Sequence, residues 1–66
     1  MAEHRMMRHF DYRGLPPDLQ EISMMVGELA YRMIHELPEC AETTTGLRKL
    51  LEAKDCFIRA KTEALS

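Results

Sequence analysis

The sequence predicts an all-α fold: an antiparallel two-helix hairpin with a short N-terminal arm or helix, which assembles into a homo-oligomer. Two long segments, 17–37 and 41–64, carry apolar residues at helical spacing. Pro38 separates them, and the alternation typical of a strand occurs nowhere. A chain of 66 residues buries only a modest part of its surface, so we expect association with other copies to supply stability.

Residues 1–14 form the arm, "MAEHRMMRHFDYRG", and residues 15–66 form the helical hairpin domain. The arm is basic and carries aromatic residues, and a short helical turn is compatible with it. Gly14 then interrupts the chain, and Pro16 and Pro17 follow. Proline suits the first turn of a helix, because the N–H that it lacks would have no helical partner there.

The first helix is predicted from Pro17 to Leu37. One apolar face results from its stripe of Leu19, Ile22, Val26, Leu29, Met33 and Leu37. Gly27 costs about 1 kcal/mol of helix propensity relative to alanine, so it either permits close approach of another helix or is simply tolerated.

The second helix is predicted from Ala41 to Ala64, with Glu39 and Glu42 at the favourable end of its dipole. Its inner stripe consists of Leu47, Leu50, Leu51, Phe57, Ile58 and Leu65. Two helices of about 30 Å, joined by the short turn "PECAE", make an antiparallel hairpin.

Apolar residues beyond these stripes predict contacts between hairpins. We expect hairpins to pack on one another through Met24, Met25, Tyr31 and Phe57, because one hairpin cannot cover them all. The alternative is that the methionines fill one small core as flexible side chains.

Composition argues against several classes of protein. The net charge of −2, from nine basic and eleven acidic residues, gives no bulk attraction to DNA or RNA. The N-terminus lacks the apolar run of a signal peptide, and no segment approaches the length of a membrane span. We therefore expect a soluble, cytosolic chain that binds neither DNA nor a membrane.

Metal, disulfide and catalytic chemistry are also not expected, and no cofactor is implied. Cys40 and Cys56 lie sixteen positions apart, about 24 Å along a helix, so an intrachain disulfide is implausible. His4, His9 and His35 show no ligand spacing with the cysteines. A pair of Cys40 with His35 is conceivable, but no third group supports catalysis.

Binding is better supported, because the start of the first helix should lie beside the end of the second. The arm would then approach two cations late in the second helix. An aromatic ring beside guanidinium and ammonium groups can stack on a base and bind phosphates. The candidate ligand-binding residues are Tyr12, Arg59, Arg13, Arg8, Lys61 and Phe10.

The threonine run at the start of the second helix is a possible second anion site. Thr43, Thr44 and Thr45 lie where N–H groups are free, and Arg48 lies one turn on. The favoured interpretation is that the hydroxyls cap the helix, since Glu42 disfavours an anion there.

The strings "FDYRGLPP" and "LPECAETTTGLRKLLEAKDCFIRA" resemble the phage anti-CBASS cyclic-oligonucleotide sponge family, whose hairpin is also similar to a domain of some anti-Thoeris sponges. The resemblance covers about residues 10–61. Its pattern is a proline after the first helix, an acidic residue with Ser/Thr before a leucine, then L-x-x-L-x-E-A and I-x-A. Here these positions are Pro38, Glu42, Thr44, Leu47, Leu50, Glu52, Ala53, Ile58 and Ala60.

The resemblance implies a hexamer of hairpins that sequesters cyclic dinucleotides, such as 3′,3′-cyclic GMP–AMP (3′,3′-cGAMP), between protomers without cleaving them. In some members, cyclic trinucleotides are held at separate pores. It further implies action in the host cytoplasm against CBASS-type immune signalling. Tyr12 matches the family's base-stacking tyrosine by position. Arg59, or else Lys61, matches its late cation.

Two other functions remain open from the residues alone. The wide apolar surface also suits a structural or protein-interaction helical hairpin module. A DNA-binding regulator is disfavoured by the acidic balance.

Overall fold

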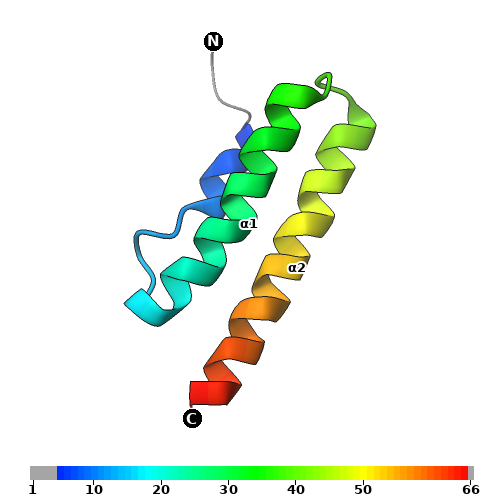
Figure 1. Ribbon diagram of the computed structural model, residues 1–66. Helices are drawn as coiled ribbons and strands as arrows, with labels where there is room; N and C mark the ends of the chain where they lie inside the picture. The colour runs from blue at the N-terminus through cyan, green and yellow to red at the C-terminus, as the bar shows by residue number, and fades with distance from the viewer. Residues whose placement is uncertain (1–4, 66) are drawn as a thin grey trace.

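The computed structural model describes residues 5–65, without the side chains of Arg5 and Arg8. It contains the 3-10 helix η1 (Arg5–Phe10), the helix α1 (Pro17–Glu36) and the helix α2 (Ala41–Leu65). Helices α1 and α2 lie antiparallel, side by side (Figure 1). Within residues 5–65 there is no strand. The all-helical hairpin is therefore confirmed, with the helix ends within one residue of the prediction.

The prolines account for both ends of α1. The carbonyl of Pro16 accepts hydrogen bonds from the backbone N–H groups of Leu19 and Gln20, at 2.9 and 3.0 Å. At the other end, the N–H of Leu37 donates to the carbonyl of Met33 at 2.9 Å. Proline lacks the N–H that would continue the helix, so Pro38 turns the chain toward α2.

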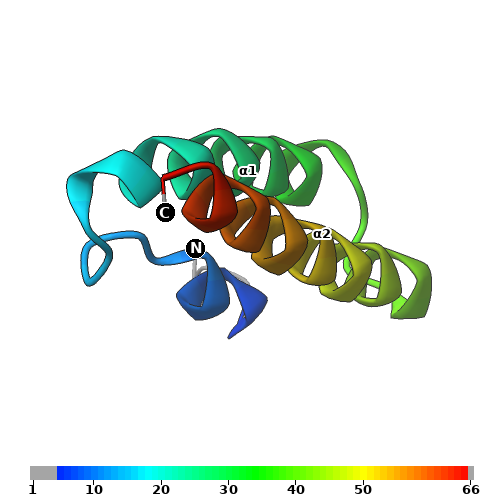
Figure 2. The same cartoon turned by 90° about the horizontal axis from the view of Figure 1, so that it is seen from below.

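Helix η1 occupies one of the two grooves between α1 and α2. Figure 2 shows this arrangement along the hairpin axis, with η1 below both helices. Phe10 and Met6 of η1 are buried, and they pack with Val26, Ala30 and Leu47 of the hairpin. Because one aromatic and one aliphatic side chain of the arm pack in this cluster, the arm is part of the folded core and not a loose extension.

Small residues of α1 form the surface against which η1 packs. Ser23, Gly27 and Ala30 recur at helical spacing on one face, and both Ser23 and Ala30 are fully buried. A methyl group on Gly27 would lie 3.4 Å from the backbone oxygen of Phe10 and 3.6 Å from its Cβ. Gly27 thus permits close approach of the arm, where the sequence suggested a helix.

The exposed methionines do not fill this core. Met24 and Met25 are 47% and 57% exposed, and Tyr31 and Phe57 are exposed to a similar degree. The alternative in which these methionines complete one small core is therefore wrong. Their exposure agrees with the prediction that they contact another molecule, which stays a prediction.

Candidate functional site

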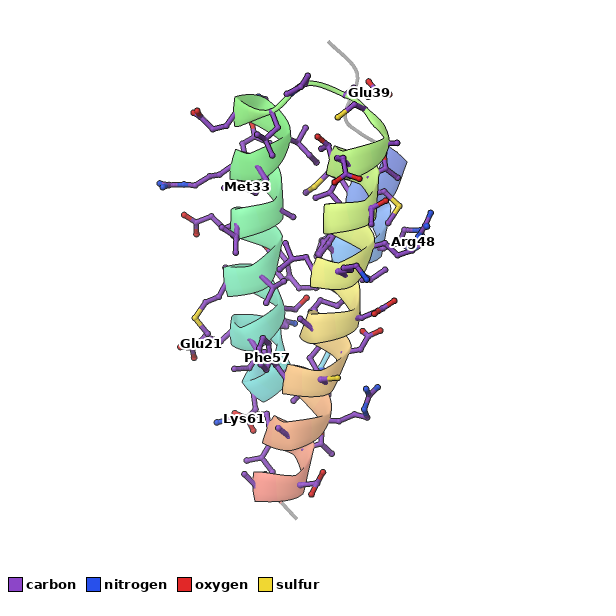
Figure 3. All side chains as sticks on the ribbon, turned by 90° about the vertical axis from the view of Figure 1, so that its right-hand side faces the viewer. Glu21, Met33, Glu39, Arg48, Phe57 and Lys61 are labelled. Atoms are coloured by element: carbon purple, nitrogen blue, oxygen red, sulfur yellow. The ribbon has the colours of Figure 1, made fainter. Side chains whose placement is uncertain are left out.

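The second groove of the hairpin is open and apolar. We call it the open face; a hollow of about 580 Å³ there is lined by Ile22, Met25, Val26, Leu29, Leu50, Phe57, Ala60 and Lys61. A second hollow of about 290 Å³, bounded by Met33, Leu37, Gly46 and Leu47 among others, continues it toward the turn. Figure 3 looks onto this face, with Phe57 and Lys61 between the helices and η1 behind α2.

The loop between η1 and α1 carries Tyr12 and Arg13. Tyr12 is half-buried, and its backbone oxygen accepts a hydrogen bond from the N–H of Leu15 at 3.0 Å. The Arg13 guanidinium donates to both carboxylate oxygens of Asp11, from Nε at 3.0 Å and from Nη2 at 2.8 Å. These side-chain bonds, and one from the Arg13 backbone N–H, hold the pKa of Asp11 well below its usual range. Arg13 is thus already paired with an acid.

Phe10 does not present its ring at the surface. Its side chain is only 3% exposed, because the ring lies in the core under η1. The expectation that Phe10 shares an exposed ligand surface with Tyr12 is therefore not met in this chain. Arg8, another candidate, has its side chain outside the described residues.

The cation that meets the arm is Lys54, which the sequence analysis missed. Its Nζ donates to the backbone oxygen of His9 at 2.8 Å and lies 5.8 Å from the centroid of the Phe10 ring. Lys54 follows Leu47 by seven positions and Leu50 by four, so it stands at an inner position of α2. This helical spacing was the sequence feature that could have indicated an inward-facing Lys54.

Arg59 and Lys61 lie elsewhere. Nη2 of Arg59 contacts Sγ of Cys56 at 3.3 Å, and no hydrogen bond or ion pair joins Arg59 to the described side chains of the arm. Lys61 lines the open face, whereas η1 packs in the other groove (Figure 3). The start of α1 does lie at the same end of the molecule as the end of α2 (Figure 1). A single chain nevertheless does not gather Lys61 and the arm on one face.

The threonine run has a structural role at the start of α2. Thr43 is buried, and its hydroxyl donates to the carbonyl of Pro38 at 2.7 Å. It also lies 3.4 Å from Sγ of Cys40, while the N–H of Thr44 donates to the Cys40 carbonyl at 3.0 Å. Thr43 therefore ties the first turn of α2 to the preceding turn, but its hydroxyl donates to a carbonyl and does not act as the predicted cap of a free N–H group. Thr44 is half-buried, whereas Thr45 and Arg48 are exposed.

Hydrogen bonding also alters the chemistry of Cys40, a free and exposed thiol. Contact with the side chain of Thr43, and hydrogen bonds from the backbone N–H groups of Thr43 and Glu42, lower the pKa of this thiol. His35 is not its partner, because that ring packs against Tyr31 at a tilt of 59°, with the ring centroids 4.3 Å apart. Across residues 5–65, no group of three His, Cys, Asp or Glu side chains has the arrangement of a metal site.

No described helix is long and apolar enough to cross a membrane. No family model, curated protein or solved structure matches the chain. Its function is therefore inferred from the residues themselves and from the resemblance given above.

Proposed function

We propose that the chain is a phage anti-defence sponge, a homo-oligomer that binds cyclic dinucleotides and sequesters them without cleavage. Cyclic trinucleotides are a second ligand class that the resemblance suggests. Capture of the messenger would block CBASS-type immune signalling in the host cytoplasm. The observation that carries this proposal is the open face, which leaves large apolar side chains uncovered beside a cation.

The open face supports self-association. Met25 and Phe57 are 57% and 55% exposed, and Leu29, which lines the same hollow, is 46% exposed. Contiguous apolar surface of this kind marks an interaction site on soluble proteins. A second copy of the chain would cover it with side chains of the same type, as in the isologous interface of a two-fold dimer.

The positions of the candidate ligand residues favour a site between copies. Tyr12 belongs to the arm, whereas Lys61 lines the opposite groove. Two chains can bring an aromatic ring of one beside a cation of the other. A cyclic dinucleotide has two bases and two phosphates, so a two-fold site with paired rings and paired cations suits it.

Calorimetry with 3′,3′-cGAMP tests the proposal on the wild-type chain and on Tyr12→Ala. Loss of one base–aromatic stack should cost about 1–3 kcal/mol and so weaken binding about fivefold or more. Tyr12→Phe is the matched control, because it keeps the ring that stacks on a base and removes only the hydroxyl. Absence of heat with every cyclic di- and trinucleotide would defeat the proposal.

A structural or protein-interaction hairpin module is the alternative. It is favoured by the burial of Phe10, which removes one candidate from a ligand surface, and by the pairing of the exposed Arg13 with Asp11, which already neutralises that cation. Under this alternative the oligomer forms, but changes of Arg13 and Arg59 to alanine alter no affinity for a cyclic nucleotide.

A further inference from the structure

Lys54 is a buried lysine at the junction of the arm and the hairpin. Lys54 is only 7% exposed, although lysine normally keeps its ammonium group in water. Within residues 5–65, no carboxylate lies at ion-pair distance from it. Its polar partner is instead the backbone oxygen of His9, at 2.8 Å.

This contact caps the end of η1. The last carbonyl groups of a helix have no partner within it, and they form the negative end of its dipole. His9 is the penultimate residue of η1, so the ammonium group meets one of these carbonyls. Because one partner is charged, the bond is stronger than a neutral one.

The same ammonium group also secures Phe10. It lies 5.8 Å from the centroid of that ring, within the range of a cation–π attraction. The backbone oxygen and Cβ of Phe10 lie beside Gly27, whose absent side chain leaves room for them. Lys54 and Gly27 therefore hold the end of the arm between α2 and α1.

Tyr12 lies two residues beyond Phe10, in a loop that is fixed at both ends. On the far side, the N–H of Leu15 bonds to Tyr12 and the Gln20 side chain donates to the carbonyl of Leu15 at 2.8 Å. On the near side, the attachment is the Phe10 ring and the His9 carbonyl. Loss of the Lys54 contact would release only this near side.

We propose that Lys54 is a positioning residue, which holds the end of η1 so that Tyr12 is presented in one place for ligand. The proposal rests on the proposed function where it concerns ligand. Its first part, that Lys54 fixes the arm, is a property of the free protein and is tested without ligand.

Hydrogen exchange on the full chain tests the first part. Lys54→Met keeps the length of the side chain but removes the donor, and Lys49→Met removes an exposed charge from the same helix. We expect the amides of His9 and Phe10 to exchange about tenfold faster or more in Lys54→Met, because a charge-assisted bond is lost. Lys54→Arg and Lys49→Met should keep wild-type protection.

Two results would overturn this part. One is a wild-type chain whose amides in η1 show no protection, which requires no variant. The other is Lys54→Met with unchanged exchange in the arm. If Lys54→Met does not fold, Lys54→Leu, which also removes the donor to the His9 carbonyl, is compared in the same way, and unchanged exchange there counts equally against the proposal.

Binding of 3′,3′-cGAMP in a double-mutant cycle tests the second part. Lys54→Met should weaken binding about fivefold or more in the wild-type background, but should have no further effect when Tyr12 is already alanine. Equal weakening in both backgrounds shows that Lys54 does not act through Tyr12 and overturns the positioning role. Lack of binding by the wild-type chain defeats the proposed function and this second part, while the exchange result still decides the first.

Discussion

Cys40 is the residue whose chemistry the fold changes most directly. The side chain of Thr43 contacts its sulfur, and the first N–H groups of α2 point to it, so the thiolate is favoured over the thiol. A lowered pKa in the folded state means that this group adds stability as the pH rises through that pKa. The contribution is complete above the ordinary thiol pKa of the unfolded chain and is lost as the pH falls.

Alkylation of Cys40 should therefore proceed at lower pH in the folded chain than in the unfolded one. In a Cys56→Ser background, the rate of reaction with iodoacetamide is measured against pH, with and without urea. We expect the midpoint of the folded profile to lie below the unfolded one, whose ordinary thiol value is 9.0. Thr43→Ala should move the folded midpoint back upward. Coincident folded and unfolded profiles would contradict the prediction.

Single residues also show where the sequence alone could not predict which side chains are buried. Phe10 and Tyr12 lie two positions apart in the arm and have similar side chains, yet one is buried and the other half-buried. Sequence could not separate them, because the difference depends on the direction in which η1 enters the groove. Lys54 was missed for another reason: lysine is almost never fully buried, so an inner position occupied by lysine is normally read as an exposed one.

At the level of elements, the sequence predicted α1 and α2 with their ends, but it allowed only a short helical turn in the arm, where η1 lies. Proline at both ends and apolar residues at helical spacing define α1 without reference to the rest of the molecule. Helix η1 has six residues and no strong local signal, and it is held by tertiary contacts. The small residues Ser23, Gly27 and Ala30 on one face of α1 were the sequence feature that indicated close packing of another segment there.

The two glycines inside the helices should respond differently to alanine. A methyl group at Gly46 of α2 meets nothing within 4 Å, whereas one at Gly27 meets Phe10 at 3.4 Å. We expect Gly46→Ala to raise the free energy of unfolding by about 0.5–1 kcal/mol, the difference in helix propensity. Gly27→Ala should gain less, because the arm must accept the contact.

Urea unfolding followed by circular dichroism measures both changes, at one protein concentration. A larger group extends the comparison: Gly27→Val should displace Phe10 and reduce stability. Should Gly27→Val be as stable as the wild type, the packing surface described for the arm would be wrong.

For the whole molecule, the arm completes one side of the hairpin and leaves the other uncovered. The proportions of the chain, 40 × 20 × 15 Å, give a flat rod whose open face is one of its long sides. The resemblance suggested a hexamer, and the apolar face is compatible with association, but sequence periodicity cannot say which of two grooves a short arm will fill. Because η1 packs in one groove and Lys61 lines the other, Tyr12 and Lys61 do not share a face of one chain.

Two phenylalanines separate folding from association. Phe10→Ala should lower the free energy of unfolding by about 3 kcal/mol, because it empties a buried site. Phe57→Ala should leave the fold intact, since Phe57 is 55% exposed, but should shift the oligomer toward smaller species. Sedimentation velocity over a range of concentrations measures the second effect. A wild-type chain that sediments as a monomer throughout would contradict the predicted association.

The separation of the arm from Lys61 determines how ligand binding should depend on the concentration of the chain. If one copy supplies the ring and another the ammonium group, a solitary chain is folded but has no complete pocket. Capture of messenger should then rise more steeply than in proportion to the number of chains made, and dilution should release ligand from protein that remains intact. Under the proposed function, the first copies made in an infected cell would therefore bind no messenger until enough further copies had been translated.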